Sequence, residues 1–252
     1  MMRSLIIGGG EIGQAMKEVL EPYYEVFMRD LMAPPVWNGK YPHPEIMHIC
    51  FPYSDGFVAD VRDYQREYQP RLTVIHSTVP VGTTAKCWID GMEFGAVHSP
   101  IRGMHPNLAE GIKTFVKFVG GPQFSADEVA EYFRRAGIRV YLCRDSATTE
   151  LAKVADTSFY AVCIEFVKEL ERICDKHDVP FAEAFTLFQQ TYNEGWTLLG
   201  RSEYCRPILV PIRRKQGGHC TLPNLEFYQD SHFADLVKLL NGGTPDKEIS
   251  RG

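Results

Sequence analysis

A glycine-rich turn near the amino terminus constrains this chain more than any other feature. Residues 8–13 read GGGEIG, and they follow the short apolar run Ser4–Ile7, which is typical of a buried parallel strand. A helical pattern begins at Gln14, so the glycines are spaced G-x-G-x-x-G between a strand and a helix. Such glycines permit the turn, let the backbone approach a pyrophosphate, and allow close packing of helix on strand. The pattern predicts dinucleotide binding, with helix N–H groups facing the anion.

An acidic residue supports this interpretation. A second apolar run, Tyr24–Met28, leads into Arg29 and Asp30, which stands at the distance expected for a group that binds ribose hydroxyls. Asp30 therefore favours NAD. NADP stays open, because a shift of one residue would place the Arg29 guanidinium where a 2′-phosphate binds. A glycine turn that binds no ligand is the other interpretation.

Apolar runs of strand length alternate with helical patterns as far as residue 143. Further strands are predicted at 46–51, 72–76, 95–98, 114–119 and 138–143, and helices at 57–68 and 125–136. Ser125 and Glu128 form a capping-box pattern at the start of the second helix. This alternation predicts an α/β fold, a Rossmann-type doubly wound parallel sheet. We expect residues 1–146 to form the NAD(P)-binding domain.

The pattern changes to helix alone after residue 146. Apolar residues recur every three or four positions from Leu151 to Ile173, with neither Gly nor Pro before Pro180, which predicts one helix of about eight turns. Shorter helices are predicted at 181–192 and 230–240. We expect a smaller all-helical domain at 147–240, which provides dimerisation and a substrate cleft, and a disordered tail at 241–252. A long helix with apolar residues on several sides predicts a homodimer.

Composition excludes several classes of partner. The net charge is −5 without a basic stripe, so nucleic acid is not an expected partner. The chain has neither an apolar run near the roughly 18 residues that span a bilayer nor a signal-peptide pattern, so we expect no membrane partner and a cytoplasmic protein. Seven cysteines without a C-x-x-C pair argue against a disulfide framework or a zinc site. We expect reduced thiols, six of them packing residues, and no metal.

Three motifs carry the candidate chemistry. STVPVGTT at 77–84 follows a strand, ELAK at 150–153 opens the long helix, and GGHC at 217–220 comes later. The thiol of Cys220 lies beside glycines, and His219 or Lys153 could lower its pKa. The order and spacing of these motifs resemble the UDP-glucose/GDP-mannose (nucleotide-sugar) dehydrogenase family and, more broadly, the 6-phosphogluconate dehydrogenase-like group. The resemblance extends to about residue 230, and we expect a short form that lacks the family's C-terminal nucleotide-binding domain.

The resemblance implies NAD(P)-dependent oxidation of a CH–OH group. It implies that Cys220 is a nucleophile, that Lys153 steadies the developing oxyanion, and that Thr78 lies near the nicotinamide. Three positions depart from the family pattern: a glutamate, an asparagine and an aspartate are replaced by Ile101, Thr157 and Asn224. In that family the alcohol is oxidised twice to a carboxylate, through a thioester on the cysteine that is then hydrolysed. The three changes remove groups needed mainly for the second oxidation and for the hydrolysis of the thioester.

The candidate residues follow from both arguments. Those expected to bind the cofactor are Gly8, Gly10, Glu11, Ile12, Gly13, Asp30, Pro52 and Thr78. Those expected to bind substrate are Arg102, Glu150, Asp156 and His219. Arg102, with His98 and His105 in the same loop, could supply charge for a phosphate or carboxylate group of the substrate. The expected function is an NAD(P)-dependent oxidoreductase acting on a small sugar or hydroxyacid derivative. The alternative is a catalytically inactive NAD-binding sensor or scaffold of the same fold.

Overall fold

The computed structural model describes residues 2–30, 43–89, 94–103, 106–211, 224, 227 and 232–242. The chain forms two compact units, Met1–Val154 and Ala155–Gly252. The division falls within helix α6 (Ser146–His177), whose first residue coincides with the end of the first domain predicted from the sequence. The predicted domain limits otherwise stay a prediction.

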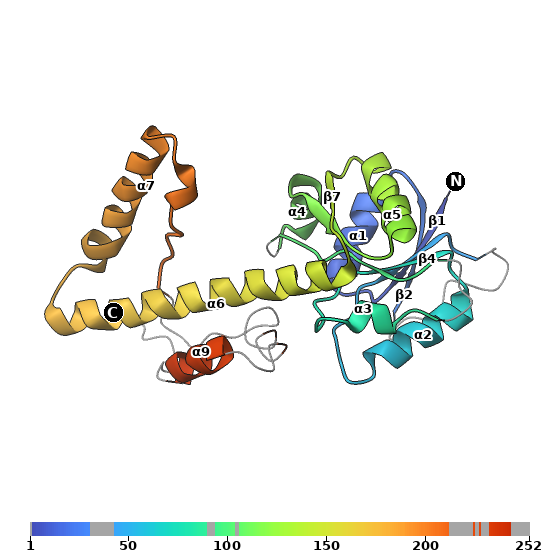
Figure 1. Ribbon diagram of the computed structural model, residues 1–252, viewed down its shortest axis with the longest axis horizontal. Helices are drawn as coiled ribbons and strands as arrows, with labels where there is room; N and C mark the ends of the chain where they lie inside the picture. Colours follow the sequence, from blue (N-terminus) through green and yellow to red (C-terminus); the bar gives the residue numbers. More distant parts are fainter. Residues whose placement is uncertain are drawn as a thin grey trace. The chain divides into compact units, whose positions relative to one another are not determined.

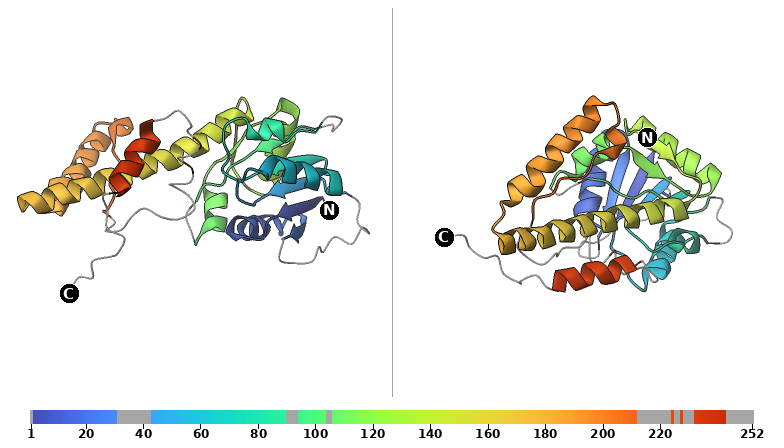
Figure 2. Two further views of the ribbon diagram at one scale, coloured as in Figure 1. Left: turned by 90° about the horizontal axis from the view of Figure 1, so that it is seen from below. Right: turned by 60° about the vertical axis from the view of Figure 1, so that its left-hand side comes forward.

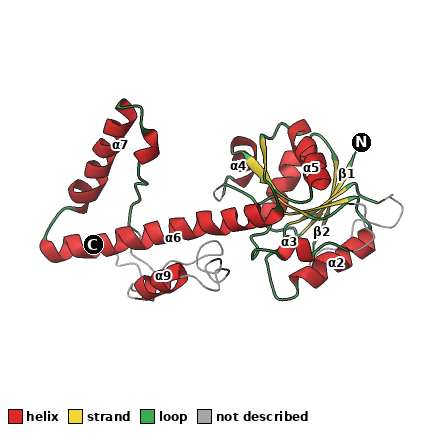
Figure 3. Cartoon of the chain, in the orientation of Figure 1, coloured by secondary structure: helices red, strands yellow, loops and turns green. Residues whose placement is uncertain are grey.

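The first unit contains a five-stranded parallel sheet. Its strands are β1 (Arg3–Ile7), β2 (Glu25–Arg29), β3 (Ile46–Ile49), β4 (Leu72–Ile75) and β5 (Val97–His98). They lie in the order β2-β1-β3-β4-β5, and Figure 3 draws the strands in yellow among the helices of this unit. The predicted Rossmann-type sheet is confirmed. The strand order reverses between β1 and β3, which is where open α/β sheets bind their ligands, at the carboxyl ends of the strands.

A second pair of parallel strands extends this unit. β6 (Lys117–Val119) pairs with β7 (Val140–Leu142), and an antiparallel bridge joins His98 of β5 to Gly120. This bridge joins the pair β6 and β7 to the parallel sheet at His98.

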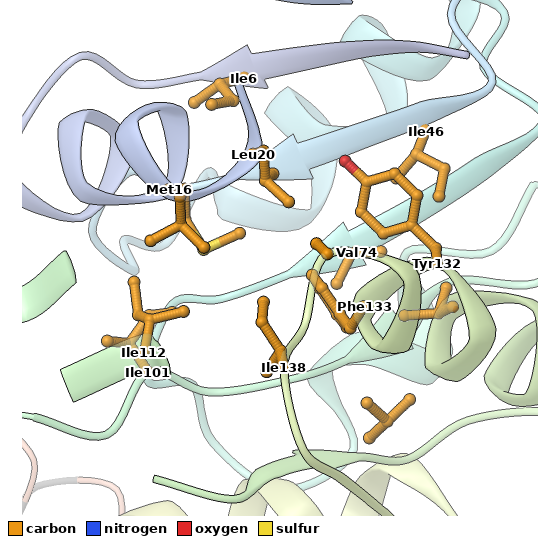
Figure 4. Close-up of a cluster of buried hydrophobic side chains, with 14 of the residues drawn as sticks. Ile6, Met16, Leu20, Ile46, Val74, Ile101, Ile112, Tyr132, Phe133 and Ile138 are labelled. Carbon is orange, nitrogen blue, oxygen red and sulfur yellow. The ribbon is translucent and has the colours of Figure 1, made fainter. Parts of the chain in front are cut away.

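Helices cover both faces of the sheet (Figure 1). The elements α1 (Glu11–Leu20), α4 (Leu108–Thr114) and α5 (Gln123–Arg135) pack on one face, and α2 (Phe57–Tyr68) and α3 (Thr83–Lys86) lie on the other. Figure 4 shows the hydrophobic core on the face covered by α1, α4 and α5, which contains Met16 and Leu20 of α1 and Phe133 of α5. Because α5 begins at Gln123 after Pro122, Ser125 lies buried inside the helix, and the predicted capping box is wrong.

The second unit is helical. It contains the rest of α6, the π-helix η1 (Ala182–Leu187), α7 (Phe188–Leu198), the 3-10 turn η2 (Ser202–Tyr204) and α9 (His232–Gly242). The predicted long helix is therefore present as α6. In Figure 2, α9 lies along α6, where Val237 packs on Ala161 and the Lys168 Nζ donates to Asn241 Oδ1 at 3.3 Å. Residues 241–242, predicted as tail, belong to α9, and 243–252 lie outside the described residues.

No described helix combines the length and the apolar character needed to cross a membrane. In the same residues, no group of three or more His, Cys, Asp or Glu side chains is arranged to hold a metal ion. The six cysteines that the structure describes are free thiols. Cys205 is exposed, so the prediction that all six are packing residues is wrong for this one.

Candidate functional site

The glycine turn joins β1 to α1, and two of its glycines are required by the fold. Gly8 has φ +102°, and a Cβ there would lie 3.0 Å from backbone atoms of Cys50 and Phe51. A Cβ on Gly13 would lie 1.9 Å from the Gly8 carbonyl oxygen. Both positions exclude a side chain because backbone atoms occupy the space.

Gly10 differs from its two neighbours in the motif. A Cβ on Gly10 would meet no described atom within 4 Å, and its φ of −68° is one that any residue adopts. The folded chain therefore does not itself require glycine at this position. Gly10 is the N-cap residue of α1, and no side chain there makes a capping hydrogen bond. Open space beside an uncapped helix N-terminus fits a pyrophosphate, which needs close approach to backbone N–H groups.

Asp30 lies directly beside this turn. Its Oδ2 accepts a hydrogen bond from the Gly9 backbone N–H at 2.5 Å, and the Gly8 N–H donates to the Arg29 carbonyl at 2.9 Å. The carboxylate thus stands at the end of β2, where an acidic residue can bind ribose hydroxyls. Arg29 lies near Tyr68 of α2: burial raises the pKa of Tyr68 to about 12, and the Arg29 charge acts to lower it.

The remaining cofactor candidates surround the turn in different ways. Pro52 is exposed just after β3, at the reversal of strand order. The side chain of Ile12 packs against the hydrophobic core, so only its backbone faces the turn. Glu11 is exposed and, with Gly9 and Gly10, lines an open hollow of about 790 Å³ beside residues 106–110.

The loop that follows β4 carries Thr78, which is partly buried. Its neighbour Ser77 donates from Oγ to the Phe51 carbonyl at 2.5 Å, and the Ser77 carbonyl lies 3.1 Å from His98 Nε2. At the far end of the loop, the carboxylate of Glu150 accepts hydrogen bonds from Gly82 N at 2.6 Å and Thr84 N at 2.7 Å. The loop is thus attached to the sheet at one end and to α6 at the other.

Glu150 is completely buried, and both of its oxygens are used in holding this loop. Burial raises the pKa of its carboxyl group, while the backbone hydrogen bonds act in the opposite direction. Sequence reasoning missed this structural role, because the burial of Glu150 and its contact with residues 66 and 68 positions away become visible only in the folded chain. Its predicted contact with substrate stays a prediction.

His98 and Arg102 do not form a joint cationic pair. Burial lowers the pKa of His98 to about 3, so its ring is neutral near pH 7 and supplies no charge, contrary to expectation. Arg102 is exposed, and its guanidinium lies 5.5 Å from the ring centre of Phe118 and 5.7 Å from that of Phe115. Its predicted role in binding substrate stays a prediction, and His105 lies outside the described residues.

Lys153 is half-buried on α6, one turn after Glu150. Its charge contributes, after burial, to the lowered pKa values of His98 and Lys117. The predicted nucleophile Cys220 and its neighbour His219 lie outside the described residues. Their proximity to Lys153 is therefore untested.

The positions that depart from the family pattern have clear surroundings. Ile101 is buried in the core beneath α4, so this position carries no polar chemistry. In the second unit, Asn224 Nδ2 donates to Thr157 Oγ1 at 3.5 Å, and both residues are buried. Two of the changed residues thus contact each other. Asp156 is exposed on α6, and its predicted substrate role is untested.

Beneath the site, buried polar side chains form a chain across the sheet that sequence reasoning missed. Ser4 Oγ lies 2.7 Å from Tyr132 Oη, which lies 3.2 Å from His48 Nε2. His48 Nδ1 is 3.0 Å from His76 Nε2, and His76 Nδ1 is 2.7 Å from the Ser99 carbonyl. The Lys117 Nζ donates to the same carbonyl at 3.0 Å. Histidines within otherwise apolar strands were the available signal.

Comparison with known proteins identifies the fold. No protein-family model and no curated protein sequence matches the chain. Among solved structures, it is similar to UDP-D-ManNAc dehydrogenase from Pyrococcus horikoshii, with a TM-score of 0.76, 18% identity, and coverage of 96% of this chain and 68% of that one. It is also similar to 3-hydroxyisobutyrate dehydrogenase from Mycobacterium tuberculosis, with a TM-score of 0.69, 14% identity, and coverage of 98% and 96%.

A third structure, UDP-glucose dehydrogenase from the archaeon Pyrobaculum islandicum, gives a TM-score of 0.70 at 15% identity, covering 96% of this chain and 68% of that one. The chain thus spans about two thirds of the UDP-sugar enzymes and nearly all of the hydroxyacid enzyme. Its fold is that of these dehydrogenases, which confirms at the level of the fold the resemblance inferred from the motifs.

Proposed function

We propose that the protein is an NAD-dependent oxidoreductase that acts on a CH–OH group of a small sugar or hydroxyacid derivative. The observation that carries this proposal is the contrast within the glycine turn. Gly8 and Gly13 are closed by backbone atoms, whereas the space beside Gly10 is open at the uncapped start of α1. A glycine that the fold does not need is explained by a ligand whose pyrophosphate approaches it.

The described residues suggest how the cofactor is held. Gly10 and the first turn of α1 bind the pyrophosphate, and Asp30 binds the adenosine ribose. Pro52 and Thr78 follow β3 and β4, on the other side of the strand-order reversal from Asp30, so they would hold the nicotinamide end of a bound dinucleotide. Dehydrogenases of nucleotide sugars and of 3-hydroxyisobutyrate among the structural neighbours support this class of cofactor and substrate.

Asp30 also favours NAD over NADP. Its carboxylate is already anchored on Gly9, where it would repel a 2′-phosphate, and the Arg29 guanidinium donates to the Asp30 carbonyl at 2.9 Å and acts on the charge of Tyr68. A guanidinium placed for the phosphate would be needed for NADP.

The proposed chemistry rests on Lys153. When bound, the nicotinamide accepts a hydride from the carbon of the substrate alcohol. The half-buried ammonium of Lys153 would stabilise the alkoxide that forms when the hydroxyl proton passes to water, and the hydride then leaves the carbon that bears this oxygen. The nucleophilic role of Cys220, implied by the resemblance, stays a prediction, and the buried Ile101 supplies no carboxylate for hydrolysing a thioester.

The first test is calorimetric titration of the protein with NAD, NADH, NADP and NADPH, repeated with the Asp30→Ala variant. We expect micromolar affinity for the NAD pair and about tenfold weaker binding in the variant, since a charged hydrogen-bond partner is lost. Failure of all four nucleotides to bind the folded wild-type protein would show that the glycine turn is purely structural.

A catalytically inactive NAD-binding sensor or scaffold is the second candidate. The observation that favours it is the absence of a polar group at position 101, where Ile101 belongs to the core. Hydride transfer separates the two functions. A panel of sugars and hydroxyacids is mixed with the NAD-saturated protein, and absorbance of NADH is followed. Tight NAD binding without reduction by any substrate would favour the sensor.

We also propose a homodimer formed through α6. Phe159 is 61% exposed and Phe166 is 55% exposed on this helix, which is unusual for large apolar side chains in a monomer. Sedimentation equilibrium tests this proposal, and a monomer at micromolar concentration would refute it. The cytoplasmic location stays a prediction from the sequence.

A further inference from the structure

Two consecutive residues of α6 hold the loop 77–84 at its two ends. Glu150 accepts hydrogen bonds from the backbone N–H groups of Gly82 and Thr84. Thr149 reaches the other end through His98, whose Nδ1 is 2.8 Å from Thr149 Oγ1 and whose Nε2 is 3.1 Å from the Ser77 carbonyl. The start of α6 therefore contacts the loop both before and after Thr78.

The contact made by Glu150 is strong for a physical reason. A carboxylate that accepts two backbone N–H groups at 2.6 and 2.7 Å makes charge-assisted hydrogen bonds. The residue is completely buried, so water cannot replace the carboxylate if it is removed. Loss of the carboxylate would leave the two backbone N–H groups without this acceptor. Because buried donors without an acceptor are costly, we expect the loop to move and not to keep its place around an empty space.

The contact made by Thr149 depends on a neutral histidine. The Ser77 carbonyl can only accept, so His98 carries its proton on Nε2 and donates it to that oxygen. The other ring nitrogen is then an acceptor that faces the Thr149 hydroxyl, whose one proton is shared between this nitrogen and the Ser146 carbonyl at 2.9 Å. His98 and Thr149 are both buried completely, so solvent does not compete for these hydrogen bonds.

We propose that Glu150 is a positioning residue, which together with Thr149 and His98 sets the place of Thr78 relative to Lys153. Lys153 stands three residues after Glu150 on the same rigid helix, so fixing the loop to Glu150 also fixes its distance from Lys153. This inference rests on the proposed function, in which the nicotinamide end of the cofactor lies against this loop. In this role Glu150 acts on the site through the loop that it holds.

The test compares a whole cofactor with a fragment of it. ADP-ribose reaches the glycine turn and Asp30 but lacks the nicotinamide, so only NADH depends on the loop. For Glu150→Gln we expect NADH affinity to fall by about tenfold and ADP-ribose affinity to change less than about twofold. Hydrogen exchange of the peptide 77–87 should accelerate in the free variant, because an amide group can accept only one of the two bonds.

Asp145→Ala is the matched control for general weakening of α6. Asp145 Oδ1 accepts from Thr148 N at 2.8 Å and caps the helix without touching the loop. We expect this variant to lose stability while the ratio of NADH affinity to ADP-ribose affinity stays unchanged. A lowered ratio in this control as well would assign the effect to the helix and overturn the positioning role.

Thr149→Val carries the test if Glu150→Gln does not fold. It removes the hydroxyl group at nearly constant volume, and we expect the same selective loss of NADH affinity. The inference would be overturned by a folded variant that binds NADH and ADP-ribose as tightly as the wild-type protein and shows unchanged hydrogen exchange in the peptide 77–87. Wild-type protein that binds neither NADH nor ADP-ribose would instead refute the proposed function, so the two failures are distinguishable.

Discussion

His48 and His76 hydrogen-bond to each other in the core of the first unit, with His48 Nδ1 3.0 Å from His76 Nε2 and the two rings stacked. The Ser99 carbonyl 2.7 Å from His76 Nδ1 selects the tautomer of that ring. His76 then donates to Ser99 from Nδ1 and accepts from His48 through Nε2. This arrangement requires both rings to be neutral, and it links the fold to pH.

The buried histidines predict a protein that loses stability in mild acid. Burial, aided by the Lys117 charge, lowers the pKa of His48 to about 3 and that of His76 well below 6.5, and burial lowers that of His98 to about 3. Below pH 6.5 the unfolded chain binds protons that the folded chain does not. The free energy of unfolding therefore falls from pH 6.5 down towards 3, by about 1.4 kcal/mol per pH unit for each histidine. Urea unfolding between pH 7 and 4.5 measures this slope.

His98→Gln should reduce the slope by the contribution of about one proton, because glutamine does not titrate. Its side-chain amide can still donate to the Ser77 carbonyl, so this hydrogen bond is kept. The matched control is His177→Gln, because His177 is exposed at the end of α6 and bears no burial cost. A stability independent of pH in the wild-type protein would contradict the prediction.

Lys117 predicts that the free energy of unfolding also rises with pH in alkali, in the same direction as the effect of the histidines in acid. Burial lowers its pKa to about 7, so between pH 7 and 10.5 the unfolded chain binds a proton that the folded chain lacks. Stability should rise with pH in this window, by up to about 1.4 kcal/mol per unit. Lys117→Met should remove that rise and stabilise the protein at pH 7, as measured by thermal unfolding. Lys113→Met on the exposed face of α4 should do neither.

Gly10→Ala and Gly13→Ala should separate binding from folding. A methyl group at Gly10 meets nothing within 4 Å, so the variant should fold like wild type but bind NAD at least about tenfold more weakly, because the pyrophosphate needs that space. A methyl group at Gly13 would lie 1.9 Å from the Gly8 oxygen and should cost about 1–3 kcal/mol of stability. Calorimetry and urea unfolding report the two effects, and undiminished NAD binding by Gly10→Ala would disprove the assignment.

Lys153→Ala should affect turnover and spare cofactor binding. If the ammonium stabilises the alkoxide, kcat should fall by about 10²–10³ while NAD affinity stays within about twofold. The control is Lys86→Ala, an exposed lysine of α3. Full activity of Lys153→Ala on any substrate that the wild-type protein oxidises would end this assignment.

The sequence alone carried much of the architecture. The helix 57–68 was predicted with the bounds that α2 has, and strands 46–51 and 72–76 overlap β3 and β4. The sequence also predicts that Asp30 belongs to the same site as the glycine turn, and its carboxylate accepts a hydrogen bond from the Gly9 N–H. These features depend on apolar periodicity and on glycine conformation, which are properties of neighbouring residues and can be read locally.

The failures of prediction have a common cause. Ser125 has the sequence of a helix cap, yet α5 begins two residues earlier and buries it. His98 was expected to carry charge near the substrate, but burial in β5 keeps it neutral. Local patterns describe what a residue prefers, whereas desolvation depends on what the rest of the chain packs against it.

The sequence by itself therefore determined the alternation of strands and helices, the glycine turn and its acidic partner, but not the helices α3 and α4. The tertiary structure alone decided that Glu150 holds Gly82 and Thr84, 68 and 66 residues away, and that His48 meets His76 across the sheet. Such contacts join groups that carry no mutual pattern in the sequence. They form because a buried polar group must find a partner when water is excluded, and only the packed fold determines which partner is within reach.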